Sequence, residues 1–439
     1  MSFEWRTLPL GELCIKITDG AHNSPKTALV GKPMASVKDL TRFGVDLSQA
    51  RLISADEFAL LVKQGCKPEV GDVLIAKDGN SALDTVCNVD YELDAVMLSS
   101  VAILRPNPSL LDSHYLKHYL SSPNVIDYLK SNFISGAAIP RVVLKDFKKA
   151  EIKLPSLNTQ KSIAAILDIV DGRIALLVET NATLEAIAKA IFKSWFVDFD
   201  PVHAKQQGLM PQGMDEATAA LFPSSFKESE LGLVPIEWMV GKVVDIGEVI
   251  CGKTPPTSES ANYGNDVPFI TIPDMHNLLV ITSTSRSLST LGANTQKKKT
   301  LPPGSICVSC IATAGLVARV TMPSQTNQQI NSVVPSEKWG KSFPLFTLRR
   351  IGDAVRAGGS GGSIFHNLNK SDFEQLKVLF PSEHLAMAFN EIIEPIIDKI
   401  TANQLQAQNL ARLRDTLLPR LVSGQLRLSD TLEIPEDQI

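Results

Sequence analysis

Residues 247–254 have types and spacing that could bind a phosphate. They fit the pattern G-x-x-x-x-G-K-[ST], in which glycines let backbone N–H groups wrap the phosphate and the lysine meets its charge. Such a loop also needs a helix directly after the lysine, so that the helix N-terminus points at the phosphate. Pro255 and Pro256 follow at once, and the next residues have no apolar helical period. A loop that offers Lys253 to a DNA phosphate is therefore favoured over a nucleotide site.

Other chemical motifs are incomplete. Cys307 and Cys310 have the spacing of half a zinc site, but no second cysteine or histidine pair stands at zinc spacing. The six cysteines are scattered along 439 residues, which is typical of reduced structural thiols. Motifs of serine hydrolases, zinc proteases and amino-methyltransferases are missing. We therefore expect no catalytic residue, no metal and no cofactor, and interpret the chain as a binding protein.

Polar loops supply the candidate contacts with nucleic acid. Basic and amide side chains grip phosphates or read base edges. The net charge of −4 does not exclude DNA, because only the contact surface must be basic. A charged run is also commonly just a solvated surface, and that alternative stays open. The candidates of the first half are His22, Asn23, Lys26, Lys77 and Asn80, and those of the second half are Lys253, Thr254, Lys297, Lys298 and Lys299.

Two long helices are expected to position these loops. From Ile163 to Trp195 apolar residues recur at alternating steps of four and three, with Asn181 as the polar exception, which is the seam of a coiled coil. Such a helix is about 50 Å long and narrowly striped, so it needs a partner helix. The seam recurs 226 residues further on, from Phe389 to Leu421. The partner is therefore expected in the same chain.

The two asparagines predict how these helices pair. An antiparallel pairing with level ends brings Ile163 to Leu421 and Asn181 to Asn403. A buried asparagine opposite leucine would leave its amide unsatisfied, whereas two facing asparagines can hydrogen-bond and fix the register. We expect an intramolecular antiparallel coiled coil with this register. The alternative is that each polar residue leans out to solvent beside a slightly different seam.

The remaining sequence is duplicated as well. The five residues from Gly71 recur in altered form from Gly304, Glu4-Trp5 recurs as Glu237-Trp238, and residues 135–140 resemble residues 360–365. Each half shows short apolar segments broken by turns, which predicts a mixed α/β fold. The chain is therefore expected to contain two copies of one unit, a globular domain followed by a long helix.

The expected boundaries follow from these patterns. They are residues 1–155 for the first globular domain, 156–200 for the central helix, 201–237 for a linker rich in Pro, Gly and polar residues, 238–380 for the second domain, 381–425 for the C-terminal helix and 426–439 for a tail. No apolar run reaches the roughly 18 residues of a membrane span, and the start of the chain does not read as a signal peptide. We expect a soluble, cytoplasmic protein.

Several segments resemble the specificity subunit of type I restriction-modification enzymes, the HsdS family. The resemblance covers the whole chain as two target-recognition domains, each followed by a helical spacer. The segments that carry it are Leu154-Pro155 with Gln160 to Ala164, Asn181 to Ala186, Phe192 to Pro201, the linker phrases Leu221 to Pro223 and Ser229 to Trp238, and Leu417 to Gly424.

The resemblance implies a non-catalytic subunit that binds a bipartite, asymmetric site in double-stranded DNA, with one half-site for each domain. It also implies two modification subunits that bind S-adenosylmethionine and methylate adenine, and restriction subunits that use ATP to translocate and cleave DNA. The helices would set the spacing of the half-sites. Trp195, Phe196 and Phe199 would form part of the docking surface for the modification subunits, or alternatively would only cap the helix end.

Two other interpretations remain at this point. One is a nucleotide-binding protein that uses Lys253, and the other is a coiled-coil scaffold that never touches DNA. The divergence of the two globular halves argues against the scaffold, because a scaffold has no reason to vary them. The resemblance names no base-reading residue, because the globular loops differ most within the family.

Overall fold

The computed structural model describes residues 5–136, 140–311, 313–356 and 368–428. Its contacts divide the chain into two compact units, and each is described by itself. Unit 1 combines Met1–Leu176 with Ala407–Ile439, and unit 2 is Leu177–Gln406. Within the described residues, no helix combines the length and apolarity that a membrane span requires.

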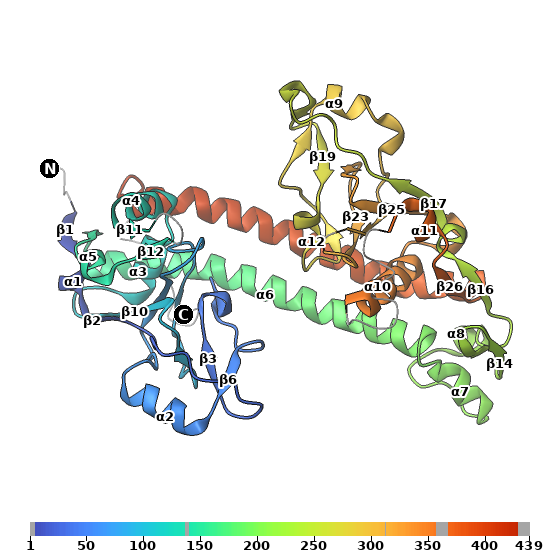
Figure 1. Ribbon diagram of the computed structural model, residues 1–439, viewed down its shortest axis with the longest axis horizontal. Helices are drawn as coiled ribbons and strands as arrows, with labels where there is room; N and C mark the ends of the chain where they lie inside the picture. Colours follow the sequence, from blue (N-terminus) through green and yellow to red (C-terminus); the bar gives the residue numbers. More distant parts are fainter. Residues whose placement is uncertain (1–4, 137–139, 312, 357–367, 429–439) are drawn as a thin grey trace. The chain divides into compact units, whose positions relative to one another are not determined.

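Two long helices are shared between the units. They are α6 (Leu157–Phe196) and α12 (Glu383–Val422), green and red in Figure 1. Unit 1 takes the first half of α6 and the last part of α12, and unit 2 takes the remainder of each. Both helices carry the apolar seam predicted from the sequence, and both extend beyond it at each end.

The helices run antiparallel within each unit. In unit 1, Ile163 and Leu167 of α6 share a buried core with Leu418 and Leu421 of α12. In unit 2 the later part of α6 meets the earlier part of α12, where Ala188 and Phe192 share a core with Phe389 and Ile393. The predicted antiparallel pairing is therefore confirmed, because residues ascend along one helix as they descend along the other.

Unit 1 is built around a four-stranded antiparallel sheet in the order β2-β10-β7-β8. Its strands are β2 (Cys14–Asp19), β10 (Val101–Pro106), β7 (Val73–Ala76) and β8 (Val86–Asn88). The smaller strands are β1 (Arg6–Pro9) paired with β13 (Glu151–Leu154), β3 (Lys32–Ala35) between β6 (Arg51–Ile53) and β9 (Val96–Met97), β4 (Leu40–Thr41) with β5 (Gly44–Val45), and β11 (Ile134–Ser135) with β12 (Arg141–Val142). The helices besides α6 and α12 are α1 (Leu10–Leu13), α2 (Ala55–Lys63), α3 (Ser113–Leu120), α4 (Pro123–Phe133) and α5 (Leu144–Phe147).

Unit 2 contains a five-stranded sheet in the order β17-β25-β22-β23-β20. Its strands are β17 (Gly247–Cys251), β25 (Ile330–Pro335), β22 (Ile306–Ser309), β23 (Val317–Val320) and β20 (Val280–Ile281). A second sheet contains β18 (Tyr263–Gly264), β21 (Ser287–Leu288), β19 (Val267–Ile270) and β24 (Gln325–Thr326), and β16 (Met239–Lys242) pairs with β26 (Lys377–Phe380). Besides α6, α12 and the helices of residues 200–237 described below, the described part of unit 2 contains α9 (Thr290–Asn294), α10 (Ser342–Arg356) and α11 (Lys370–Glu374).

The duplication seen in the sequence is also a duplication of strands. The order β2-β10-β7-β8 in unit 1 matches β17-β25-β22-β23 in unit 2. Gly71 stands before β7 with φ of 89° and Gly304 stands before β22 with φ of 95°, a conformation that favours glycine. The expected repeat of residues 135–140 at 360–365 falls partly on residues 137–139 and 360–365, which lie outside the described residues, as do Glu4 of the Glu4-Trp5 repeat and residues 429–439 of the expected tail.

Residues 201–237 are more ordered than the sequence suggested. The predicted linker contains α7 (Asp200–Gln206), α8 (Glu216–Ala220) and the hairpin of β14 (Phe226–Ser229) and β15 (Gly232–Pro235), and its role as a linker between the domains stays a prediction. Val202 and Phe222 are buried in the core of unit 2. A few widely spaced apolar residues hold the segment in place, and such spacing leaves no periodic signal.

Candidate nucleic-acid interface

An ion pair joins two of the predicted loops in unit 1. Lys77, directly after β7, places its Nζ 2.7 Å from the Asp19 carboxylate at the end of β2. His22 Nε2 lies 3.2 Å from the other oxygen of this carboxylate. The Lys77 side chain is only 5% exposed, so the expectation of a lysine free for phosphate is wrong. An unpaired ammonium buried at this depth would be strongly disfavoured, and Asp19 supplies the opposite charge.

The other candidates of unit 1 lie at exposed loop positions. His22, Asn23 and Lys26 are exposed in the early loop, and Asn80 is exposed in the turn after β7. The Lys77–Asp19 ion pair brings these two loops together. Their contact with DNA stays a prediction.

The early loop of unit 1 crosses the segment before β10 at a glycine. Gly20 N donates to the Val101 carbonyl at 3.2 Å, and Ala21 N donates to the Met97 carbonyl at 2.8 Å. A Cβ atom on Gly20 would lie 2.1 Å from the Met97 oxygen. Only glycine permits this approach of the two backbones.

Unit 2 repeats the same arrangement. Gly252 N donates to the Ile330 carbonyl at 3.1 Å, and Lys253 N donates to the Thr326 carbonyl at 2.9 Å. A Cβ atom on Gly252 would lie 2.0 Å from the Asn327 oxygen. We call the two arrangements, at Gly20 and at Gly252, the glycine crossings.

The phosphate-loop pattern around Lys253 is part of the second glycine crossing. Residues Gly247–Cys251 form strand β17, in which Gly247 pairs with Pro335 of β25. After Lys253 the described chain has no helix until the single 3₁₀ turn at Ser260–Asn262. The glycines of the pattern serve close packing of strands, and no helix N-terminus follows the lysine to meet a phosphate. The side chain of Lys253 is exposed.

A buried glutamine connects the Lys253 loop to the basic run. Gln296 Nε2 donates to the Lys253 carbonyl and to Gln325 Oε1, both at 2.8 Å. Gln325 Nε2 donates onward to the Ala293 carbonyl of α9 at 3.0 Å. The 3₁₀ turn Lys297–Lys299 follows Gln296 directly, with its first two lysines exposed and its third half-buried. The candidates of the second half are thus brought together by buried amides.

Sequence reasoning missed an amide-rich turn at the second glycine crossing. Asn327 Nδ2 donates to Gln329 Oε1 at 3.0 Å, and Gln329 N donates to Asn327 Oδ1 at 3.1 Å. Gln328, at the tip between them, is exposed and accepts a hydrogen bond from Thr254 Oγ1. The available signal was the run of four amides within residues 325–329, because amide side chains are those that read adenine.

The cysteine pair is structural. Cys307 lies in β22 and its sulfur accepts a hydrogen bond from Ser332, and the Cys310 sulfur accepts one from Asn331 Nδ2 at 3.3 Å. Burial raises the pKa of Cys307 to about 12 and that of Cys310 to about 11. Both thiols therefore stay protonated at neutral pH in the metal-free chain, and each is engaged in a hydrogen bond within the core.

The two asparagines of the coiled coil meet inside unit 2. Asn403 Nδ2 donates to Asn181 Oδ1 at 2.9 Å, and Asn181 Nδ2 donates to the Ile400 carbonyl at 3.1 Å. Asn403 is buried at 2% exposure. The predicted contact is present, and the alternative in which both side chains lean out to solvent is wrong.

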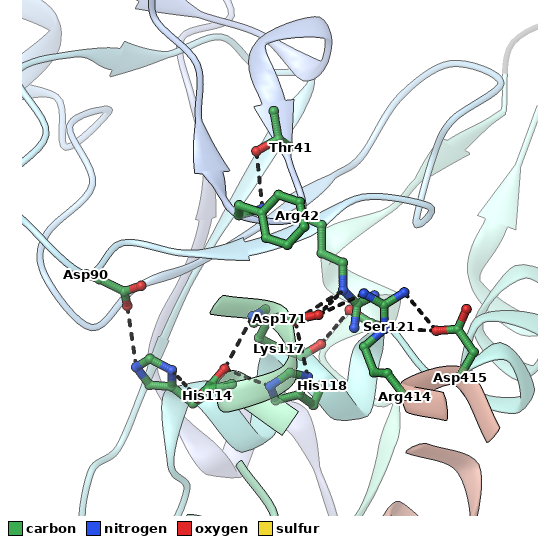
Figure 2. A network of polar contacts seen from close by, with 12 residues as sticks. Thr41, Arg42, Asp90, His114, Lys117, His118, Ser121, Asp171, Arg414 and Asp415 are labelled. Carbon is green, nitrogen blue, oxygen red and sulfur yellow. Dashed lines mark hydrogen bonds and ion pairs between the residues drawn. The ribbon is translucent and has the colours of Figure 1, made fainter. Parts of the chain in front are cut away.

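In unit 1 the carboxylate of Asp171 on α6 joins four elements (Figure 2). It accepts hydrogen bonds from Arg42 in the β4–β5 turn at 3.1 Å, from Lys117 on α3 at 3.0 Å and from Arg414 on α12 at 2.8 Å. Burial opposes its ionisation, but Lys117 and Arg42 outweigh that effect, so the pKa of Asp171 is lowered. The globular part of unit 1 is thereby fixed to both long helices.

Asp168, one turn earlier on α6, receives two histidines. His114 Nδ1 and His118 Nε2 each lie 2.8 Å from its carboxylate. Burial opposes ionisation of Asp168, yet these hydrogen bonds lower its pKa. The hydrogen bond to Asp168 raises the pKa of His114, whereas burial lowers the pKa of His118.

Among the described residues, one group has the donors of a metal site, namely His118, Asp168 and Asp171. Lys117 Nζ lies 3.4 Å from Asp168 and 3.0 Å from Asp171. An ammonium group therefore already neutralises these carboxylates. The arrangement is an internal ion-pair network of the kind that holds elements together.

The aromatic residues at the end of α6 lie inside unit 2. Trp195 and Phe196 are 6% and 3% exposed, so their expected role as a docking surface is wrong. Phe196 packs at ring distances of 5.1 Å from Phe343 and Phe389, which come from parts of the chain far away in sequence. Phe199 is half-buried in the left-handed conformation at φ of 54°. The alternative, that these residues only cap the end of α6, agrees with the structure.

Comparison with known proteins gives consistent matches. A family model described as "Type I restriction modification DNA specificity domain" matches residues 3–186 and again residues 235–414. The Type I restriction enzyme HindI specificity subunit of Haemophilus influenzae is 35% identical over 380 residues, which cover 77% of this chain and 83% of that protein. The MjaIX specificity subunit of Methanocaldococcus jannaschii is 27% identical over 326 residues, which cover 72% of this chain and 70% of that protein.

A solved structure supports the fold. The S subunit of a type I restriction-modification system from M. genitalium aligns with a TM-score of 0.54 at 15% identity, over 96% of this chain and 97% of that one. At this identity the likeness concerns the fold, in which two globular halves and two long helices occur together.

Proposed function

This chain belongs to the family of type I restriction-modification DNA specificity subunits, and we propose that each globular half reads one half of a bipartite, asymmetric DNA site. Specificity subunits are the non-catalytic, sequence-recognising components of type I complexes, and the family domain occurs twice here. The observation that supports the proposal best is the pair of glycine crossings. The two crossings share backbone hydrogen bonds, while their loop residues differ in charge and chemistry.

The contact surface of each half would be the loops that meet at its glycine crossing. In the first half these carry the exposed His22, Asn23, Lys26 and Asn80, and in the second half the exposed Lys253, Lys297 and Lys298 with the half-buried Thr254. Lysines would grip phosphates and fix the position on the duplex, and histidine and amide side chains would contact base edges. Lys299, half-buried, would contribute mainly to the local positive charge.

The two long helices would set the distance between the half-sites. A 40-residue helix is about 60 Å long, and half-sites one turn of DNA apart are separated by roughly 34 Å. Asn181 and Asn403 would fix the register of the pair, because slippage would leave the buried amide of Asn403 and the half-buried amide of Asn181 without their partner.

The partners would be two modification subunits and, through them, restriction subunits. With Trp195 and Phe196 buried, the docking surface would lie on the outer faces of the helices. Five apolar side chains there are 44–55% exposed. One exposed apolar side chain is ordinary, but several along two helices support a surface for a partner. They are Ile169, Val178 and Ile187 of α6 and Leu405 and Leu413 of α12.

Base-resolution methylation mapping tests the proposal. The full chain is co-expressed with a methyltransferase subunit of a type I system with which it forms a complex, in a host that lacks other adenine methylation. We expect one new methyladenine motif in two parts with a fixed gap, and exchange of residues 1–155 for those of a relative changes one part only. A stable complex on a column without any new motif would favour a scaffold that does not read DNA.

A further inference from the structure

We propose that Gln328 reads an adenine in the half-site of the second globular domain and that Thr254 orients its amide. The inference rests on the proposed function and assigns one base-reading contact within it. Its basis is the second glycine crossing, where the Lys253 loop and the amide-rich turn at residues 327–329 lie against each other.

Gln328 has the chemistry that adenine requires. Adenine presents an acceptor at N7 and a donor at N6 in the major groove, and a glutamine amide matches both at once. The Gln328 side chain is exposed, and among the described residues its Oε1 has one hydrogen-bond partner, the Thr254 hydroxyl. A carbonyl oxygen has two lone pairs, so it can accept from adenine N6 as well, while Nε2 donates to N7.

The neighbouring amides support the tip without reading bases. Asn327 and Gln329 bond to each other through two hydrogen bonds at 3.0 and 3.1 Å, which close the turn around Gln328. Gln325 and Gln296 are buried and hold the base of the loops. All five amides make hydrogen bonds within the protein, and Gln328 is the one whose side chain is exposed.

The direction of the hydroxyl hydrogen bond prepares the amide for binding. Thr254 Oγ1 donates to Gln328 Oε1, so the rotation of the amide is set before DNA arrives. A side chain that is already ordered in the free protein loses less conformational entropy when DNA binds. Lys253, which precedes Thr254 in the chain, is exposed, so its ammonium is available to a DNA phosphate.

The first domain differs at the matching positions. The backbone hydrogen bonds equate Gly20 with Gly252, Ala21 with Lys253 and Met97 with Thr326. By that alignment His22 stands where Thr254 stands, and Ser99 stands where Gln328 stands. The same framework therefore presents a different set of donors and acceptors, as two halves that read different sequences require.

The test compares methylation motifs of complexes assembled from the full chain and its methyltransferase subunit. Gln328→Ala should make one A·T position degenerate in a single half of the motif, with discrimination reduced roughly 5- to 150-fold. Thr254→Val should weaken the same position to a smaller extent, whereas Thr254→Ser, which keeps the hydroxyl, should preserve it. Gln375→Ala, at an exposed glutamine after α11, is the matched control and should leave the motif unchanged.

The outcomes separate this inference from the proposed function. The other half of the motif serves as an internal control for folding and assembly. An unchanged motif in Gln328→Ala would overturn the inference, and so would a uniform fall in methylation without any change of motif. Failure of the unaltered chain to give a two-part motif would instead contradict the proposed function itself.

Discussion

Arg414 of α12 donates a hydrogen bond to Asp171 of α6 at 2.8 Å, in a part of unit 1 where the two side chains are 10% and 4% exposed. Arg414 interrupts the apolar seam of its helix, and Asp171 stands beside the seam of the other. A charge inside a coiled-coil seam is tolerated only when it is paired, and this pair supplies that condition.

Asp171→Ala should therefore lower the stability of unit 1 strongly. The substitution leaves Arg414, Lys117 and Arg42 without their shared carboxylate, and breaking a buried pair from one side costs about 3–5 kcal/mol. Urea unfolding of the full chain measures the change. Asp415→Asn is the control, since Asp415 also bonds Arg414 but is 55% exposed, and it should cost less than about 1 kcal/mol. Equal effects of the two substitutions would contradict the role given to Asp171.

His114 should contribute stability that depends on pH. Its pKa is raised in the folded chain by the hydrogen bond to Asp168, so its contribution is fully present below the unfolded value of about 6.5 and is lost as pH rises through the folded value. Thermal unfolding of His114→Gln should therefore show a deficit at pH 5.5 that shrinks by pH 8.5. A deficit that is constant over this interval would contradict the prediction.

Asp168 and Asp171 of the same network should make the folded chain less stable at acid pH. The pKa values of Asp168 and Asp171 are lowered, so their contribution is present above the unfolded value of about 3.9 and disappears as pH falls through the folded values. His118 works in the same direction nearer neutrality, because burial lowers its pKa and the unfolded chain takes up the proton first.

Asn181 and Asn403 should behave as a coupled pair. Asn181→Leu leaves the buried amide of Asn403 without this partner, which costs about 1–3 kcal/mol. Asn403→Leu should cost less, because Asn181 is half-buried and keeps its hydrogen bond to the Ile400 carbonyl. The double substitution should recover most of that stability, because an apolar pair in the seam is favourable, while the helices lose a feature that fixes their register. A double-mutant cycle by thermal unfolding measures the coupling, and additive single effects would show that the two side chains act independently.

Lys253→Ala should weaken DNA binding without changing its sequence preference. A phosphate contact contributes through counterion release, so affinity should fall for specific and unrelated DNA alike, and the slope of log K against log salt should decrease by about one. Fluorescence anisotropy of the assembled complex over a range of salt measures both quantities. Lys227→Ala removes an exposed lysine from strand β14 and is the matched control. An unchanged salt slope in Lys253→Ala would exclude the phosphate contact.

The sequence predicted the parts of this structure that depend on regular spacing. The apolar seam predicted the antiparallel helices and the contact of Asn181 with Asn403. Both predictions were possible because a heptad repeat and its polar interruption are local patterns in the sequence. The repeat at Gly71 and Gly304 gave two matching strands, because each glycine is required by its positive φ.

The sequence could not predict features that depend on distant partners. From the sequence alone Lys77 is expected to be an exposed cation, but in the structure it pairs with Asp19, which lies 58 residues earlier in the chain. Phe196 is likewise expected to be an exposed aromatic residue, but in the structure Phe343 and Phe389 pack against it. The sequence also could not single out Gln328 in the amide-rich turn, because only the fold shows which of several amides faces solvent.

The sharing of both long helices has a consequence for synthesis of the chain. Unit 1 draws on residues 1–176 and on the last part of α12, so it cannot be completed until residues 177–406 have been translated. At about 5–20 residues per second, this interval is on the order of 10–50 s. During that time the first half of α6 lacks its helical partner and leaves Leu167 and its apolar neighbours uncovered. Release of a nascent chain shortened before residue 407 should therefore yield an aggregation-prone fragment, and the order of translation becomes part of how this protein assembles.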